Sequence, residues 1–69
     1  FQEMLQAPQE VEIIQRVKGN KKYFFVLNYM DSEQKIALKK QMRSLYDNVI
    51  VNGEICLKPY ETVVYEVLE

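Results

Sequence analysis

Apolar and polar residues alternate with a period of two in two segments of the chain. From Val11 to Lys18, successive residues fall on two faces: Val11, Ile13, Gln15 and Val17 against Glu12, Ile14, Arg16 and Lys18. From Thr62 to Leu68, the same alternation sets Val63, Tyr65 and Val67 against Thr62, Val64 and Glu66. An amphipathic helix would repeat every 3.6 residues, so both segments are predicted to be β-strands.

A third segment, Lys22–Met30, is the most hydrophobic part of the chain. Seven of its nine residues are apolar or aromatic, and it contains neither Gly nor Pro. It lies between one turn signal at Gly19-Asn20 and another at Asp31-Ser32. Such a run is typical of a strand buried on both faces, and we expect Phe25 to be a core residue whose loss unfolds the domain.

The register of the hairpin at Gly19-Asn20 stays open. A two-residue loop suits the turn chemistry and pairs Lys18 with Lys21. A three-residue loop would bury more apolar surface, because it brings onto the apolar face of the first strand Tyr23, Phe25, Leu27 and Tyr29. A slip of one residue moves every side chain to the other face. The choice therefore decides whether this set or the set Phe24, Val26 and Asn28 faces the core.

Two short strands are predicted in the middle of the chain. Gln34–Leu38 and Arg43–Tyr46 carry the apolar residues, and the charged residues Lys39-Lys40-Gln41 are read as the connection between them. Asp47-Asn48 ends the second strand, because both residues are common in turns.

A second hairpin is predicted next. Val49–Val51 and Glu54–Leu57 flank Asn52-Gly53, which is the strongest short-range signal for a two-residue hairpin loop. Lys58–Glu61 is predicted to be a corner, since Pro59 cannot donate a ladder hydrogen bond. In all, six or seven short strands predict an all-β fold, either a small antiparallel β-sandwich or an open barrel.

The length and composition fit one small domain and exclude several classes of site. Residues 1–9 are polar and rich in Gln, with Pro8 near their end, and are read as a linker or the tail of a preceding domain. The 69 residues contain one Cys and no His, so neither an internal disulfide nor a structural zinc site is expected, and no metal or cofactor is predicted. The net charge of −1 gives no electrostatic attraction to nucleic acid or to an anionic membrane. No signal peptide and no apolar run of about 20 residues are present, and we expect a cytoplasmic protein.

The residues that could carry catalysis have simpler structural interpretations. Without His, neither Ser32 nor Ser44 has a histidine base, and Cys56 is expected to be a buried, unreactive thiol between Ile55 and Leu57. A pair of catalytic carboxylates needs a cleft, which a domain of this size hardly offers. Solvated faces and turns account for the acids Glu12, Asp31, Asp47, Glu54, Glu61 and Glu66. The chain alone is therefore not expected to be an enzyme.

Two binding functions remain as alternatives. A carbohydrate-binding module would use exposed aromatic side chains, and the candidates are Tyr29, Tyr46, Tyr60 and Tyr65. A small nucleic-acid-binding barrel would use Tyr23 and Phe24-Phe25 beside two basic clusters, Lys18/Lys21/Lys22 and Lys35/Lys39/Lys40/Arg43. The aromatic run is better explained as core, because few other large residues are available to fill it.

Several segments, taken together and in order, resemble a known family. They are Val11–Arg16, Lys22–Tyr29, Leu45–Asp47, Asn52-Gly53, Leu57–Tyr60 and Val63-Val64. Residues 10–69 resemble the small C-terminal β domain of glycoside hydrolase family 42 β-galactosidases. The chain differs from the family pattern at Glu61, where Gly often follows Pro-Tyr, and at Asp47-Asn48, where Thr-Gly is usual. The C-terminal β domains of family 13 α-glucosidases and amylases are similar at the Leu27-Asn28 strand end and the Pro59-Tyr60 corner.

The resemblance implies a non-catalytic accessory domain of a β-galactosidase, a hydrolase acting on β-galactosides. Its role would be structural, with the catalytic barrel domain of the parent chain as partner and a homo-oligomer of the parent as a further one. The catalytic glutamates of the family would lie in that barrel, so no catalytic, cofactor-binding or metal-binding residue is assigned here. Asn28 is expected to close its strand by hydrogen-bonding the next turn, and Pro59-Tyr60 to set the last corner.

Overall fold

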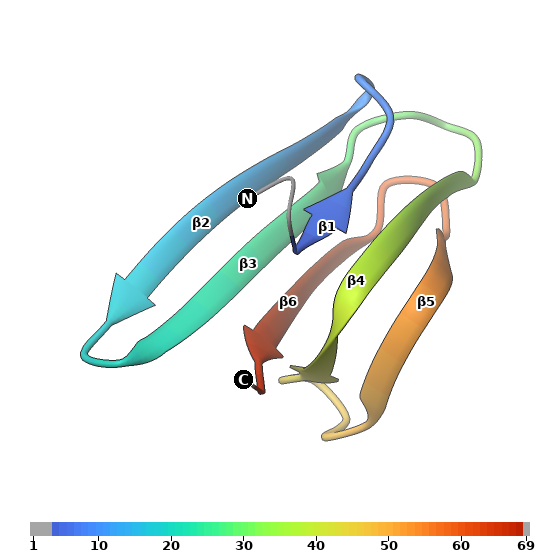
Figure 1. Ribbon diagram of the computed structural model, residues 1–69. Helices are drawn as coiled ribbons and strands as arrows, with labels where there is room; N and C mark the ends of the chain where they lie inside the picture. The colour runs from blue at the N-terminus through green and yellow to red at the C-terminus, as the bar shows by residue number, and fades with distance from the viewer. Residues whose placement is uncertain (1–3, 69) are drawn as a thin grey trace.

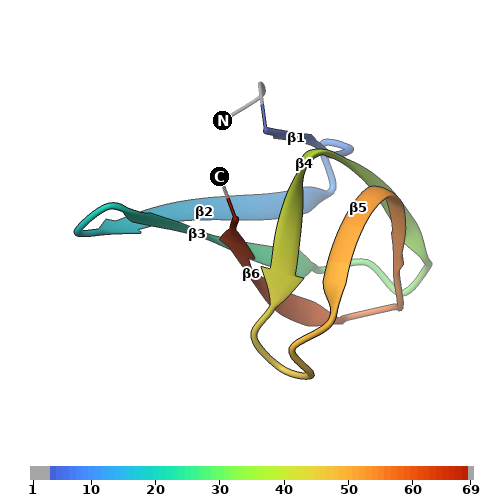
Figure 2. The same ribbon diagram turned by 60° about the horizontal axis from the view of Figure 1, so that its bottom comes forward.

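A computed structural model describes residues 4–68 as one antiparallel sheet of six strands (Figure 1). The strands are β1 (Leu5–Gln6), β2 (Val11–Lys18), β3 (Lys21–Asn28), β4 (Gln34–Ser44), β5 (Ile50–Leu57) and β6 (Thr62–Val67). The order is β1-β4-β6-β3-β2, and β5 pairs with β4. The sheet curls into a half-barrel in which β4 and β5 fold over one end of β3 and β6 (Figure 2). The all-β prediction is confirmed.

The two-residue loop determines the register of the β2–β3 hairpin. Lys18 pairs with Lys21, and Gly19 has a φ of 64°, which suits the first position of a II′ turn. Phe24, Val26 and Asn28 therefore face the core. Phe25 points to the opposite face and is 38% exposed, so the expectation that it is a core residue, in a strand buried on both faces, is wrong. The turn geometry prevailed over the register that would have buried more apolar surface.

One long strand replaces the two predicted in the middle of the chain. β4 runs through Lys39-Lys40-Gln41 without a break and ends at Ser44, before the turn that was read as part of a strand. Its inward positions Ile36, Leu38 and Met42 keep the alternation of a single strand, with half-buried Lys40 in the position between. Hydropathy alone predicts a loop at these charged residues, whereas their side chains fit the exposed and half-buried positions of a strand.

The hairpin predicted at Asn52-Gly53 is also wrong, because both residues lie inside β5. Leu38 pairs with Gly53 and Met42 with Val51, so three residues of β4 face one residue of β5 in an irregular bulge. Gly53 has a φ of 71°, a conformation that glycine adopts without steric cost. The left-handed geometry therefore serves a bulge rather than a turn.

The core lies on the inner face of the curl and draws on every strand. Its members are Leu5, Val11, Phe24, Val26, Ile36, Leu38, Met42, Leu57, Val63, Tyr65 and Val67. The alternation predicted for β6 is confirmed, since its three inward residues are all buried. Leu5 is fully buried and β1 pairs with β4. A linker or tail at residues 1–9 stays a prediction, of which residues 1–3 lie outside the described residues.

Candidate functional site

Asn28 ties together three connections at one end of the half-barrel. Its side-chain amide donates to the carbonyl oxygens of Ser32, at 3.0 Å, and Lys58, at 2.9 Å. Its Oδ1 accepts a hydrogen bond from the backbone N–H of Met30 at 3.0 Å, and its own N–H donates to the carbonyl of Glu61 at 2.9 Å. The side chain is only 3% exposed. The prediction that Asn28 hydrogen-bonds the next turn is confirmed, and the same amide also holds the corner before β6.

The corner at Pro59-Tyr60 is confirmed as well. Tyr60 has a φ of 59°, and its N–H donates to the Met30 carbonyl at 3.0 Å. Glu61 closes the turn from both sides: its N–H donates to the Lys58 carbonyl at 3.0 Å, and its Oε1 accepts from the Lys58 N–H at 2.8 Å. Glu61 thus has a structural use at the position where Gly often follows Pro-Tyr.

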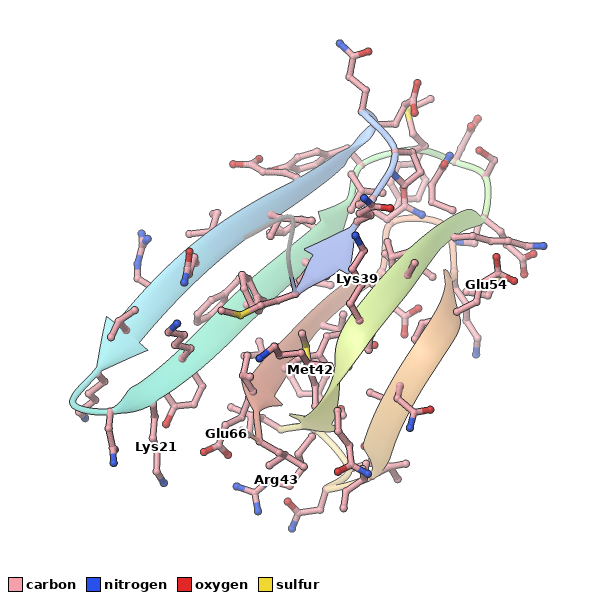
Figure 3. The ribbon with its side chains drawn as sticks, viewed as in Figure 1. Lys21, Lys39, Met42, Arg43, Glu54 and Glu66 are labelled. Atoms are coloured by element: carbon pink, nitrogen blue, oxygen red, sulfur yellow. The ribbon has the colours of Figure 1, made fainter. Side chains whose placement is uncertain are left out.

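A charged cluster closes the other end of the sheet, where Figure 3 shows Lys21, Arg43 and Glu66 together. Glu66 is 6% exposed; it accepts a hydrogen bond from Arg43 Nη2, and its Oε2 lies 3.6 Å from Lys21 Nζ. The hydrogen bond from Arg43 lowers the pKa of the Glu66 carboxyl, an effect that outweighs its burial. Lys21 and Arg43, two of the basic residues considered for nucleic-acid binding, therefore pair with a buried carboxylate.

An apolar row crosses the outer face, which is the face turned away from the core. Ile14 pairs with Phe25, and Phe25 pairs with Val64, so the three side chains lie side by side on β2, β3 and β6. Leu45 follows beside Val64, to whose carbonyl its N–H donates at 3.0 Å, and it is 43% exposed. No other described element covers this row.

Two rows in which most side chains are polar flank the apolar row. On one side lie Arg16, Tyr23, Glu66 and Arg43, in register across four strands. On the other side lie Glu12, Leu27 and Thr62, and Glu12 accepts a hydrogen bond from the Tyr29 hydroxyl. That contact raises the pKa of Tyr29. An exposed apolar patch with a polar rim is typical of an interaction surface.

A hollow lies on the inner side, where β5 and β6 do not pair with each other. Its volume is about 230 Å³. Its walls include the aliphatic residues Val49, Val51, Ile55, Leu57 and Val63, and its other lining residues are Ser44, Tyr46, Asp47, Cys56, Glu61 and Tyr65. Several of the candidate site residues therefore meet in this hollow.

The structure distributes the four candidate tyrosines over different environments. Tyr29 and Tyr60 are 57% and 67% exposed near the Asn28 end, whereas Tyr46 is 66% exposed at the rim of the hollow. Tyr65 is 4% exposed and also lines the hollow. The tyrosines therefore form no continuous platform, but Tyr46 and Tyr65 share a site.

Cys56 is exposed, which corrects the expectation of a buried thiol. β5 is an edge strand, on which Cys56 pairs with Lys35 of β4. The pKa of Cys56 is raised, first by partial desolvation and then by Glu33. Among residues 4–68, the acidic and cysteine side chains form no group of three that could hold a metal ion. No helix within the same residues is long and apolar enough to cross a membrane.

The outer apolar row and the hollow were not found from the sequence. One signal for the row was present: Ile14 and Val64 are the apolar residues on the otherwise polar faces of β2 and β6. Aligning them with Phe25 required the hairpin register, which had stayed open. The hollow depends on the curl of the sheet, which no local pattern encodes.

The chain superposes on parts of solved β-galactosidase structures. A catalytic mutant of Gan42B, a family 42 β-galactosidase from G. stearothermophilus, superposes with a TM-score of 0.86 at 25% identity, over 91% of this chain and 9% of that chain. The β-galactosidase from Bacillus circulans sp. alkalophilus superposes with a TM-score of 0.83 at 24% identity, over 93% of this chain and 10% of that one. The chain thus spans about a tenth of the length of these enzymes.

The sequence itself identifies the family. A search of curated proteins gave no match. The family model described as the β-galactosidase C-terminal domain matches residues 10–66, which is most of the chain. A second structure of Gan42B agrees, with a TM-score of 0.84 at 26% identity over 90% of this chain and 9% of that one. The chain belongs to the β-galactosidase C-terminal domain family.

Proposed function

We propose that this chain is a non-catalytic accessory domain of a β-galactosidase and that it acts by packing on the rest of the enzyme. The family assignment supports this, as does the size of the related enzymes, of which the domain makes up about a tenth. The remaining nine-tenths of such a chain is the occupant that we assign to the uncovered surface of the domain.

The observation that carries the proposal is the outer row formed by Ile14, Phe25 and Val64. Phe25 alone leaves 38% of its surface exposed at the centre of this row. Covering an apolar row gains about 25 cal/mol for each Å² removed from water. The flanking charged and polar rows match the usual anatomy of an interface, with an apolar centre and a polar rim.

The state of the acids supports the absence of catalysis. Glu66 is held by Arg43 and Lys21, and Glu12 accepts a hydrogen bond from Tyr29. Each of these carboxylates already holds a structural contact. A general acid or nucleophile has to be free to meet a substrate.

Cysteine labelling in the intact β-galactosidase that carries this domain tests the docking face. Phe25→Cys and Val17→Cys are each made with Cys56→Ser, and each labelling rate is divided by the rate of the same site in denaturant. Val17 is the matched control, because it lies on the same hairpin but on the opposite face and is 61% exposed. We expect Phe25→Cys to be labelled at least about tenfold more slowly than Val17→Cys, because the centre of an interface is buried.

Equal labelling of the two sites would contradict the proposed face, and slower labelling of Val17→Cys would place the interface on the other side. Repeating the measurement across the concentration range over which the enzyme dissociates separates contact within one chain from contact between subunits. Only the former agrees with the proposal.

A further inference from the structure

The hollow between β5 and β6 is a site that the packing role does not use. It lies on the inner side of the curl, whereas the outer row lies on the opposite face. β5 pairs only with β4, and β4 pairs with β6 only from Tyr65 to Val67, so no strand pairs with Thr62–Val64 on the side away from β3. Val51 and Ile55 form one wall and Val63 the other.

Tyr65 brings to this space a hydroxyl that has no hydrogen-bond partner among the described residues. Tyr65 is 4% exposed and lines the hollow, and no residue from 4 to 68 forms a hydrogen bond with its hydroxyl. Burial raises the pKa of Tyr65, and the carboxylates of Glu61 and Asp47 raise it further, so the hydroxyl keeps its proton. Because no described residue takes up this proton, the hydroxyl can donate to a ligand that enters the hollow.

The two acids at the hollow supply acceptors. Asp47 Oδ1 accepts from the N–H of Val49 at 3.2 Å, and Glu61 Oε1 accepts from the N–H of Lys58 at 2.8 Å. Each carboxylate therefore keeps its second oxygen without a hydrogen bond to any described residue. Ser44 adds a hydroxyl, whose oxygen accepts from the N–H of Tyr46 at 3.4 Å.

The aromatic ring of Tyr46 lies at the rim of the hollow, which Asp47 and Glu61 also line. Tyr46 is 66% exposed, and the walls next to it are aliphatic. A ligand that suits this site has hydroxyl groups that both donate and accept, together with an apolar face of C–H groups. An anion would be repelled by Asp47 and Glu61. A cation would have to lose its water against an apolar wall, which is costly.

We propose that this hollow binds a single neutral sugar ring, with Tyr65, Asp47 and Glu61 hydrogen-bonding its hydroxyls and Tyr46 covering one of its faces. The volume of about 230 Å³ is below the range of roughly 300–1,000 Å³ that is typical for larger ligands, so one ring fits and an oligosaccharide does not. The site is independent of the packing role and can fail without affecting it.

Titration of the 15N-labelled 69-residue chain with galactose, glucose and lactose tests the site, once a dispersed amide spectrum has shown that the chain is folded. We expect saturable shifts confined to residues 44–51 and 61–65, with a dissociation constant on the order of millimolar, as for a small polar ligand with few contacts. Butylammonium serves as the cationic probe and should cause no saturable shift at these residues.

Three variants identify the contacts. Tyr65→Phe removes only the unpartnered hydroxyl and should weaken binding about tenfold without loss of stability. Tyr46→Ala should weaken it about fivefold. Tyr29→Ala, an exposed tyrosine at the Asn28 end, is the control and should change nothing.

The absence of saturable shifts with all three sugars overturns the proposal. So does binding that survives both Tyr65→Phe and Tyr46→Ala, or saturable binding of butylammonium in place of sugar. None of these results bears on the outer row, which the labelling experiment tests separately.

Discussion

At the scale of the residue, Phe24 and Phe25 show how neighbouring positions of one strand acquire opposite roles. Phe24 is fully buried on the inner face, and Phe25 is 38% exposed on the outer face. Identical side chains at adjacent positions therefore differ only in the side of the sheet that each one meets. Phe24 and Phe25 are therefore a matched pair for measuring how much burial in the core contributes to the free energy of unfolding.

We expect Phe24→Ala to lower the free energy of unfolding by about 3–5 kcal/mol, because it leaves a cavity in the core. Phe25→Ala should cost about 1 kcal/mol or less, because the site is open to solvent and can collapse. Urea unfolding followed by circular dichroism measures both. A domain of this size has a stability of roughly 3–5 kcal/mol, so Phe24→Ala should be largely unfolded in water. A larger loss for Phe25→Ala than for Phe24→Ala would contradict the observed register.

At the scale of the element, Asn28 is the tie between the end of β3, the turn at 30–32 and the corner before β6. Its side chain is both donor and acceptor, and all its contacts are to backbone groups. This combination is specific to an amide. It allows a substitution that keeps size and shape but removes the donor.

Asn28→Asp should lower the free energy of unfolding by about 2–4 kcal/mol at neutral pH, because the carboxylate would face the carbonyl oxygens of Ser32 and Lys58 without a proton to share. Asn52→Asp, on exposed β5, is the control and should have a small effect. Thermal unfolding at pH 7 compares the two. If Asn28→Asp is as stable as Asn52→Asp, the hydrogen bonds of the Asn28 side chain contribute nothing to the stability of the domain.

Most of the strands were predictable, but their continuity was not. Period-two alternation was enough for β2 and β6, and the turn predicted at Asp47-Asn48 is present, with Asn48 at a φ of 63°. The continuous β4 and the bulge opposite Asn52-Gly53 were missed, because Lys and Asn-Gly have local preferences that pairing with a neighbouring strand overrides.

The two candidate surfaces, the outer row and the hollow, were harder to predict from the sequence than the strands. The outer row needs the hairpin register, and the choice between two loops differing by one residue reverses both faces. The hollow needs β5 to curl away from β6, which is a property of the whole sheet. The sequence was enough to name Tyr46 and Tyr65 as candidates. It did not show that these two residues lie at one site, nor that Tyr29 and Tyr60 lie elsewhere.

At the scale of the whole molecule, Glu66 joins the hairpin, the central strand and β4, since its partners Lys21 and Arg43 lie on β3 and β4. Its pKa is lower in the folded state than the ordinary value of 4.5. The ion pair therefore contributes stability above about pH 4.5. That contribution is lost as the pH falls through the lowered pKa, because the unfolded chain binds the proton first.

We expect the unfolding midpoint in urea to fall between pH 5 and pH 3, and part of this fall to be absent in Glu66→Gln. Glu54→Gln, which changes an exposed acid of β5, should retain the full pH dependence and is the control. If the two variants show the same pH profile, the Glu66 cluster is not the source of the effect.

β6 is the last strand in the sequence, yet it lies between β3 and β4 in the sheet. The two hairpins made earlier, β2–β3 and β4–β5, meet only through it, apart from the short β1. During synthesis, neither hairpin can bury its apolar face until Val67 has left the ribosome, because the strand that joins them is made last. A chain that stops before Thr62 is left with exposed apolar faces and cannot complete the sheet. The order of the strands therefore makes folding of this domain depend on the synthesis of β6.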